Sequence, residues 1–303
     1  MLQRELVLPR LVQRYGRADF QGAKDDTINI RIPSLLLGRE YEWRTRTAPI
    51  EIDELSEETI AVTLDKHVYS AVQITDEELT LDIESWGDQV ARPQIRAVAE
   101  KLEGYVATAM GAANFRHSVA WEAPATPTTD DFSFYTAAVE ARKALNAENV
   151  PAVGRVIVLG SDAEAAALLS PHLVKVDEAG SDSALRDAVI GRIAGFQVIG
   201  NVNSVPADFA VAFHPTAFAL ANVAPEVPAG VPAGAGAAFE SLAMRWIRDY
   251  DAMYLRDRSV YSAFAGAASV EDGRDLDEDT TGTFGDLTGE NVRAVEIAFT
   301  QGT

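Results

Sequence analysis

Residues 242–266, LAMRWIRDYDAMYLRDRSVYSAFAG, carry the pattern that decides the fold. They predict two long amphipathic strands, over 242–248 and 253–264, because apolar side chains recur at every second position. In the first strand these side chains are Leu242, Met244 and Trp246. No side chain of this stretch is placed for catalysis, so the pattern favours an assembly surface over an active site.

The residues before this block predict alternating elements. A strand over 209–213 leads to a short helix opened by Pro215, and a Pro/Gly/Ala-rich connector follows over 223–238. Further upstream, strands at 155–159 and 195–202 alternate with helical segments. Strands that alternate with helices indicate an α/β lobe.

Composition excludes several classes of protein. The chain has 303 residues and a formal net charge of −20, with a pI near 4.5, which argues against a surface that grips nucleic-acid phosphates. Cysteine is absent, so disulfides, thiolate nucleophiles and Cys-ligated metal sites are excluded. Charges interrupt the apolar residues of the first twenty positions, and no apolar run is long enough to span a bilayer. We expect an intracellular, soluble protein without a secretory signal.

Residues 27–74 predict a hairpin of unusual reach. Three isoleucines alternate over 28–32, and apolar residues occupy most even positions over 60–74, which predicts one continuous strand about three times the usual length. A hairpin this long cannot bury both faces within its own domain. Trp and Arg are favoured anchors at protein interfaces, so we expect this segment to contact another subunit. The candidate assembly residues are Arg39, Tyr41, Trp43, Arg44, Arg46 and Lys66.

A long, slightly broken helix follows the hairpin. Thr75 and Glu78 have the spacing of a capping box, and apolar residues then recur at helical spacing to about residue 110. Pro93 predicts either a kink or the start of a new helix. Residues 1–26 are interpreted as a partly helical arm rather than as core, and the alternation of Val295, Ile297 and Phe299 predicts a last strand.

The usual catalytic and ligand-binding patterns are weak or missing. VIVLGSDAE, residues 156–164, resembles a strand–turn–helix phosphate site but has a single glycine, Gly160. Aspartates at 275, 277 and 279 alternate as in a calcium loop, yet Thr280 stands where the turn glycine belongs. The four histidines are not spaced as a metal site. We therefore expect no catalytic residue, no metal and no cofactor.

Three stretches carry a resemblance to a known family. They are WGDQVARPQIRAVAEKLE over 86–103, VAFHPTAFALA over 211–221 and RWIRDYDAMYLRDRSVYSAFAG over 245–266. In their order along the chain they resemble the major capsid (coat) protein of tailed bacteriophages, of the Hong Kong phage type, in the branch that contains the podovirus coat proteins. The resemblance covers about residues 1–266.

The resemblance implies an α+β capsid fold divided into six parts. They are an N-terminal arm (1–26), an extended β-hairpin loop (27–74), a peripheral domain with a spine helix (75–122), an α/β axial domain (123–230), peripheral-domain strands (231–266) and a C-terminal extension (267–303) of uncertain role.

The resemblance also implies a non-enzymatic shell subunit. Such a subunit forms hexamers and pentamers that close into an icosahedral shell around double-stranded DNA, which it encloses without sequence-specific binding. Its expected partners are itself, a portal protein and a scaffolding protein, with no membrane partner. Its expected location is the virion, after assembly in the bacterial host cytoplasm.

Two other functions remain open from the sequence. An encapsulin-type compartment shares this fold but encloses an enzyme cargo, and DNA in purified particles would discriminate between the two. A small-molecule α/β enzyme with a site near Gly160 is the alternative from another class. A cleft of convergent polar groups and sedimentation as a small oligomer would favour the enzyme.

Overall fold

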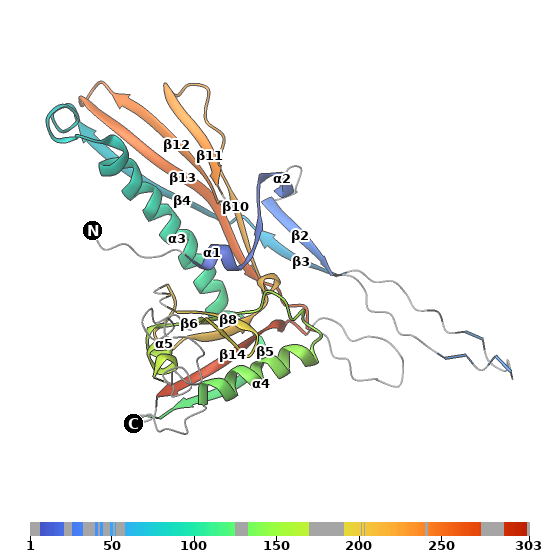
Figure 1. Cartoon of the computed structure of the whole chain (residues 1–303). Coiled ribbons are helices and arrows are strands. Elements are labelled where there is room, and N and C mark those ends of the chain that lie inside the picture. Colours follow the sequence, from blue (N-terminus) through green and yellow to red (C-terminus); the bar gives the residue numbers. More distant parts are fainter. Residues whose placement is uncertain are drawn as a thin grey trace.

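The structure is a computed structural model, and it contains two six-stranded sheets and a two-stranded ribbon over the part of the chain that it describes (Figure 1). The described residues are 7–20, 26–32, 40–41, 43–44, 49–50, 52, 58–124, 133–169, 191–200, 202, 204–239, 242–273 and 288–301. Within them, no helix combines the length and the apolar composition needed to cross a bilayer.

The first sheet is built around one long strand, β13 (Arg256–Ser269). The strand order is β1-β10-β13-β12-β11, and β4 pairs with β13 along its other edge. The partners are β1 (Gln13–Tyr15), β4 (Lys66–Thr75), β10 (Phe218–Val223), β11 (Ala233–Phe239) and β12 (Leu242–Asp251). The two amphipathic strands predicted from the sequence are therefore confirmed as β12 and β13, with 252–255 forming the turn between them.

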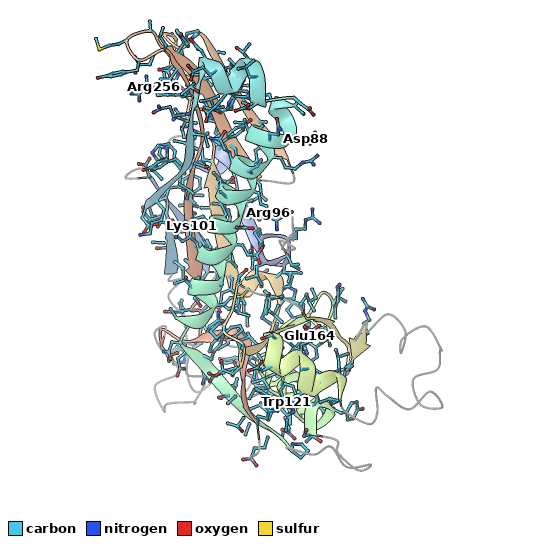
Figure 2. All side chains as sticks on the ribbon, turned by 90° about the vertical axis from the view of Figure 1, so that its left-hand side faces the viewer. Asp88, Arg96, Lys101, Trp121, Glu164 and Arg256 are labelled. Carbon is cyan, nitrogen blue, oxygen red and sulfur yellow. The ribbon has the colours of Figure 1, made fainter. Side chains whose placement is uncertain are left out.

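The spine helix α3 (Arg92–Gly111) packs against this sheet, mainly on β13 and β4 (Figures 1 and 2). Two π-helical turns, η2 (Glu78–Asp82) and η3 (Gly87–Ala91), precede it. The predicted capping box is confirmed, because Thr75 N donates to Glu78 Oε2 at 2.9 Å and Glu78 N donates to Thr75 Oγ1 at 3.3 Å. Pro93 lies in the first turn of α3, directly after η3, at a position where its fixed φ suits a helix.

A buried amide joins the spine helix to the sheet. The Gln94 side chain, 2% exposed, donates from Nε2 to Ser259 O at 2.8 Å and to Ser70 O at 3.1 Å. Ser259 Oγ donates in return to Gln94 Oε1 at 2.9 Å. Ser70 and Ser259 belong to β4 and β13, so one side chain ties the helix to two strands.

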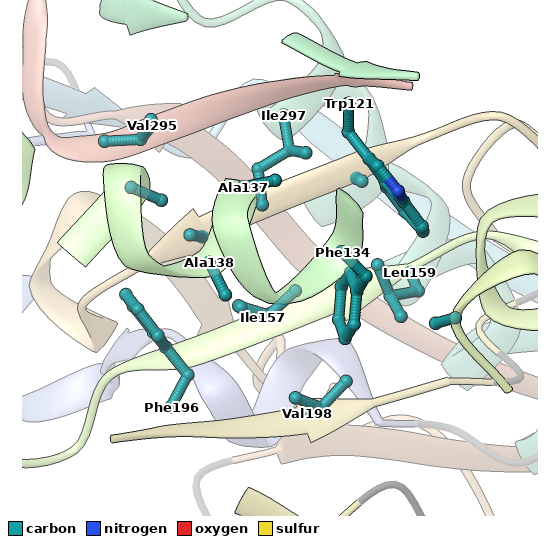
Figure 3. Packing of buried hydrophobic residues seen from close by; sticks show 14 of the residues in the cluster. Trp121, Phe134, Ala137, Ala138, Ile157, Leu159, Phe196, Val198, Val295 and Ile297 are labelled. Carbon is teal, nitrogen blue, oxygen red and sulfur yellow. The ribbon is translucent and has the colours of Figure 1, made fainter. Parts of the chain in front are cut away.

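The second sheet forms a separate lobe with the order β5-β14-β9-β6-β8-β7. Its strands are β5 (Phe115–Ala123), β6 (Val156–Leu159), β7 (Arg192–Ile193), β8 (Phe196–Ile199), β9 (Ala210–Phe213) and β14 (Asn291–Gln301). The helices predicted over this region are α4 (Ser133–Ala147) and α5 (Ser161–Leu168). Figure 3 shows Phe134, Ala137 and Ala138 of α4 packed beside Ile157 and Ile297 of the sheet.

The C-terminal strand corrects the sequence interpretation of residues 267–303 as an extension. β14 is confirmed as a strand, but it lies between β5 and β9 inside the second sheet, parallel to β5 and antiparallel to β9. Val295 and Ile297 are buried in its core. This strand is part of the body of the lobe, and β5 has no other partner among the described strands.

The helix expected after Pro215 is only one short 3-10 turn, η4 (Pro215–Ala217). The next residues form β10, a strand of the first sheet that is buried along almost its whole length. The connector expected over 223–238 likewise contains most of β11. β10 is an apolar run buried on both faces and carries no two-residue period, so periodicity cannot assign it. β11 is exposed along most of its length, and its Ala/Gly run offers no alternation of apolar and polar side chains.

The prediction of one continuous fifteen-residue strand over 60–74 is also wrong. It is divided at Leu64 and Asp65 into β3 (Glu58–Thr63) and β4, which pair in different sheets. Gly266 of β13 lies at this division, where an added Cβ would stand 1.9 Å from Thr63 O. Only a glycine leaves room for the two backbones to approach this closely.

The N-terminal arm is not excluded from the core, contrary to the sequence interpretation. It contains α1 (Leu8–Leu11), β1 and α2 (Arg17–Phe20). Leu8 and Val12 are buried in a cluster that also includes Val106 and Met110 of the spine helix. The arm therefore belongs to the junction between the two sheets.

Candidate assembly surfaces

A two-stranded ribbon extends away from both sheets (Figure 1). β2 (Thr27–Ile32) pairs antiparallel with β3, from Thr27 opposite Thr63 to Ile32 opposite Glu58. β2 confirms the strand that the alternating isoleucines over 28–32 predicted. Val62 anchors the inner end of the ribbon, fully buried against Ala219 and Ala221 of β10. Among the described strands, none pairs with the ribbon at its outer end, where Ile32 lies opposite Glu58.

The described residues between β2 and β3, here called the ribbon loop (40–41, 43–44, 49–50 and 52), lie beyond this outer end (Figure 1). Trp43 is 65% exposed and Ile52 is 85% exposed. Trp43 N donates to Tyr41 O at 2.8 Å, and the Arg44 guanidinium carbon lies 5.1 Å from the Trp43 ring centroid. An aromatic ring, a cation and apolar side chains thus share one exposed segment. Arg39 and Arg46 lie outside the described residues.

Lys66 is not part of the ribbon loop. It lies at the start of β4, opposite Ala265 of β13. Its Nζ is 2.5 Å from Asp65 Oδ2, with both side chains half-exposed, and this hydrogen bond raises the pKa of Lys66. The structure therefore separates Lys66 from Tyr41, Trp43 and Arg44.

A second exposed apolar surface was missed by the sequence interpretation. The turn between β12 and β13, here called the hairpin tip (252–255), exposes Met253 to 82%, together with Tyr254 and Leu255. Three consecutive large apolar residues in a turn were the signal that could have located it. Three cross-strand ion pairs stiffen the strands below the tip, namely Arg248–Asp257, Arg258–Asp249 and Arg256–Asp251.

The strand–turn–helix at Gly160 does not hold a ligand through its amides, because the protein itself uses them. Gly160 N donates to Phe209 O at 2.7 Å, and Asp162 N donates to Ala207 O at 2.9 Å. An added Cβ on Gly160 would stand 2.1 Å from Pro206 O. The glycine is explained by this close backbone contact, and the amides of Gly160, Asp162 and Ala163, which a phosphate would need, are already bonded.

The described histidines have structural partners. His214 Nδ1 is 2.8 Å from Thr216 Oγ1 at the start of η4, and burial, with Arg293 nearby, lowers the pKa of His214. His117 Nε2 is 2.7 Å from Glu148 Oε1, and the His67 ring lies 4.7 Å from that of Phe264. Across the described ranges, no group of three His, Asp or Glu side chains could hold a metal ion. The aspartates at 275–279 lie outside those ranges.

No protein-family model matches the chain, and no curated protein sequence matches it. Solved structures do match, over nearly the whole length. A structure of Mycobacterium phage Che8 matches with a TM-score of 0.66 and 17% identity, covering 98% of this chain and 92% of that one.

Two further matches carry capsid titles. The capsid structure of the cyanophage P-SCSP1u matches with a TM-score of 0.70 and 11% identity, over 99% of this chain and 90% of that chain. The mature capsid of bacteriophage PhiM1 matches with a TM-score of 0.65 and 10% identity, over 99% and 89%. The ribbon, the spine helix and the two sheets therefore form the Hong Kong phage-type capsid fold of tailed bacteriophages.

Proposed function

We propose that this chain is a major capsid protein, which assembles into the hexamers and pentamers of an icosahedral shell around double-stranded DNA. The fold supports a shell subunit, because the solved structures that share it include phage capsids. The observation that carries the proposal is the ribbon with its exposed loop. A shell subunit needs such a surface, whereas a self-contained enzyme does not.

The described residues of the ribbon loop leave aromatic and apolar side chains exposed, although Ile32 and Val62 of the ribbon strands are buried. A ribbon of two strands has no core of its own, and Trp43 and Ile52 remain largely exposed in the single chain. Burying the aromatic and apolar groups of the loop on a neighbouring subunit removes their surface from water, which is favourable. Arg44 adds a charge that fits an acidic neighbour, and the chain has a net charge of −20.

The remaining parts of the chain receive roles within this proposal. The lobe built on the second sheet is the axial domain and meets its copies at capsomer centres. The first sheet and the spine helix form the peripheral domain, and the ribbon lies over a neighbouring subunit. Many weak contacts per subunit then give a stable closed lattice through multivalency.

The acidic composition is compatible with enclosed DNA that binds the inner wall of the shell only weakly and can move along it. Like charge disfavours contacts between the wall and the phosphates. In this proposal a portal and a scaffolding protein are the other assembly partners, and the virion is the final location, after assembly in the bacterial cytoplasm.

Electron microscopy of a ribbon-loop deletion tests the proposal. The full chain and a chain lacking residues 36–56 are expressed, and each is examined by negative stain and by sedimentation. We expect particles from the full chain, and from the deletion a folded subunit with unchanged far-UV circular dichroism that builds no shell. A matched control replaces the exposed Val153 of the other lobe by serine, and this variant should still form particles.

Three outcomes contradict the proposal or part of it. Normal particles from the deletion variant would show that the ribbon loop is not the essential contact. Sedimentation of the full chain as a small oligomer without particles would favour the enzyme. Particles from the native source that hold a protein cargo and no DNA would favour the encapsulin-type compartment.

A further inference from the structure

A buried carboxylate joins three parts of the chain that are far apart in sequence. Glu103 lies in the spine helix and is 1% exposed. Its Oε2 accepts a hydrogen bond from Val7 N of the arm at 3.2 Å, and its Oε1 accepts one from Ser204 Oγ. Ser204 lies in the segment between β8 and β9 of the second sheet. Burying a carboxylate is costly unless hydrogen bonds compensate it, so these contacts help to keep Glu103 at this position.

The arm continues from this point across the junction of the two sheets. Leu8 and Val12 enter a cluster with Val106 of the spine helix and with Val205 and Phe213 of the second lobe. β1 then adds to the edge of the first sheet, parallel to β10, from Gln13 opposite Ala219 to Tyr15 opposite Ala221. Residues 7–15 therefore contact the helix and both sheets.

We infer that residues 7–15 are a strap, fastened by Glu103, that fixes the angle between the spine helix and the second sheet. The strap is held by one helical turn, a three-residue edge strand and three buried residues, Leu8, Pro9 and Val12. Segments with so few contacts open at lower free energy than the sheets they lie on. When β1 leaves, β10 keeps its antiparallel pairing with β13, so the arm can be released while the other strands of the first sheet and the whole second sheet stay paired.

The chemistry of the fastening predicts which substitutions release the strap. Alanine at 103 leaves the half-buried N–H of Val7 and the half-buried hydroxyl of Ser204 without this acceptor. Glutamine at 103 keeps both bonds, since its amide oxygen can accept from Val7 N and its NH₂ can donate to Ser204 Oγ. Glu100, one turn earlier on α3, pairs at 2.8 Å with Arg96 on a more exposed side and is the matched control.

Hydrogen exchange of the full chain, kept as free subunits, tests the fastening. In Glu103→Ala we expect exchange of the amides of 13–15 to accelerate by about tenfold or more, as loss of a buried hydrogen-bond acceptor predicts, while amides of β14 keep the wild-type rate. Glu103→Gln and Glu100→Ala should stay within about threefold of wild type. Unchanged exchange in the arm of Glu103→Ala would overturn the inference, as would equal acceleration in β14, which would make Glu103 a general stabiliser.

Distance measurement between two spin labels tests the angle. The chain has no cysteine, so Ala97→Cys on the exposed side of α3 and Lys143→Cys on α4 supply the labelling sites. We expect one narrow distance distribution in the wild-type background and a broadened or shifted one in Glu103→Ala. If Glu103→Ala does not fold, Leu8→Ala loosens the arm from its other attachment and is measured in the same way. A released arm with an unchanged narrow distribution would overturn the inference.

Discussion

Replacing Gln94 by alanine tests how strongly the spine helix is held on the first sheet. The change removes the three hydrogen bonds that join Gln94 to Ser70 O, Ser259 O and Ser259 Oγ. Ser259 Oγ still accepts from Trp246 Nε1 at 3.0 Å, but its own proton loses the Gln94 acceptor. One buried donor without a partner costs about 1–3 kcal/mol. The loss of the hydrogen bonds to the carbonyl oxygens of Ser70 and Ser259, together with the small cavity left by the side chain, adds about 1 kcal/mol.

We therefore expect the free energy of unfolding to fall by about 2–4 kcal/mol, a large part of the stability of an ordinary domain. Urea denaturation, followed by tryptophan fluorescence and far-UV circular dichroism, measures this loss as a lower midpoint at unchanged m-value. Wild type and variant are compared at one subunit concentration, because association stabilises the folded state by mass action. The control is Gln73→Ala on the exposed side of β4, which we expect to stay within about 0.5 kcal/mol of wild type. A Gln94→Ala loss no larger than that of the control would refute the reasoning.

Three further predictions follow from the described geometry. Gly266→Ala places a Cβ 1.9 Å from Thr63 O and should leave little soluble protein, whereas Gly236→Ala, where nothing lies within 4 Å, should be tolerated; soluble yield compares the two. Trp121→Ala removes a fully buried ring whose centroid lies 4.8 Å from that of Phe134 and 4.6 Å from that of Phe299, so unfolding in urea should become easier by about 3–5 kcal/mol; a loss as small as that of exposed Trp43→Ala would contradict this packing. Burial lowers the pKa of His214 in the folded state. The contribution of His214 to stability is therefore complete above its unfolded-state pKa of about 6.5 and is lost as the pH falls through the folded-state pKa. The difference in thermal stability between wild type and His214→Gln should be smaller at pH 5.5 than at pH 8, and a constant difference would contradict this linkage.

Local patterns predicted the elements whose signals are contained in a few residues. The alternation over 242–248 identified β12, and the spacing of Thr75 and Glu78 identified the start of the helical segment. These signals are local because the face of a strand is set by every second residue and a capping box by two residues three positions apart.

Pairing between distant segments could not be predicted in the same way. The even-numbered apolar pattern runs to Leu64 and resumes at Val68 after Lys66. One polar residue in such a pattern does not show that β3 and β4 pair in different sheets. Pro215 correctly predicted the start of a helical turn. It does not show that the buried residues after this turn pair with β13.

The residues of the candidate assembly surfaces could be predicted only in part from the sequence. Trp43 and its neighbouring arginines stood out as a basic and aromatic cluster in an acidic chain, whereas Lys66 lies outside that cluster, farther along the same predicted hairpin. The structure places Lys66 in the first sheet. The hairpin tip was missed because its apolar residues were assigned to the beginning of β13.

The position of β14 has a consequence for biosynthesis. β5 finds its sheet partner about 175 residues later in the chain, since Phe115 lies opposite Asn291, and contacts this distant in sequence form slowly. While the ribosome is still adding residues 124–290, α4 can cover the apolar face of β5, but β5 has no described strand to pair with and its backbone edge stays open. A truncated chain that ends before residue 291 is left with a divided lobe, so translation errors are expected to yield subunits that chaperones and proteases recognise before they can meet a complete copy.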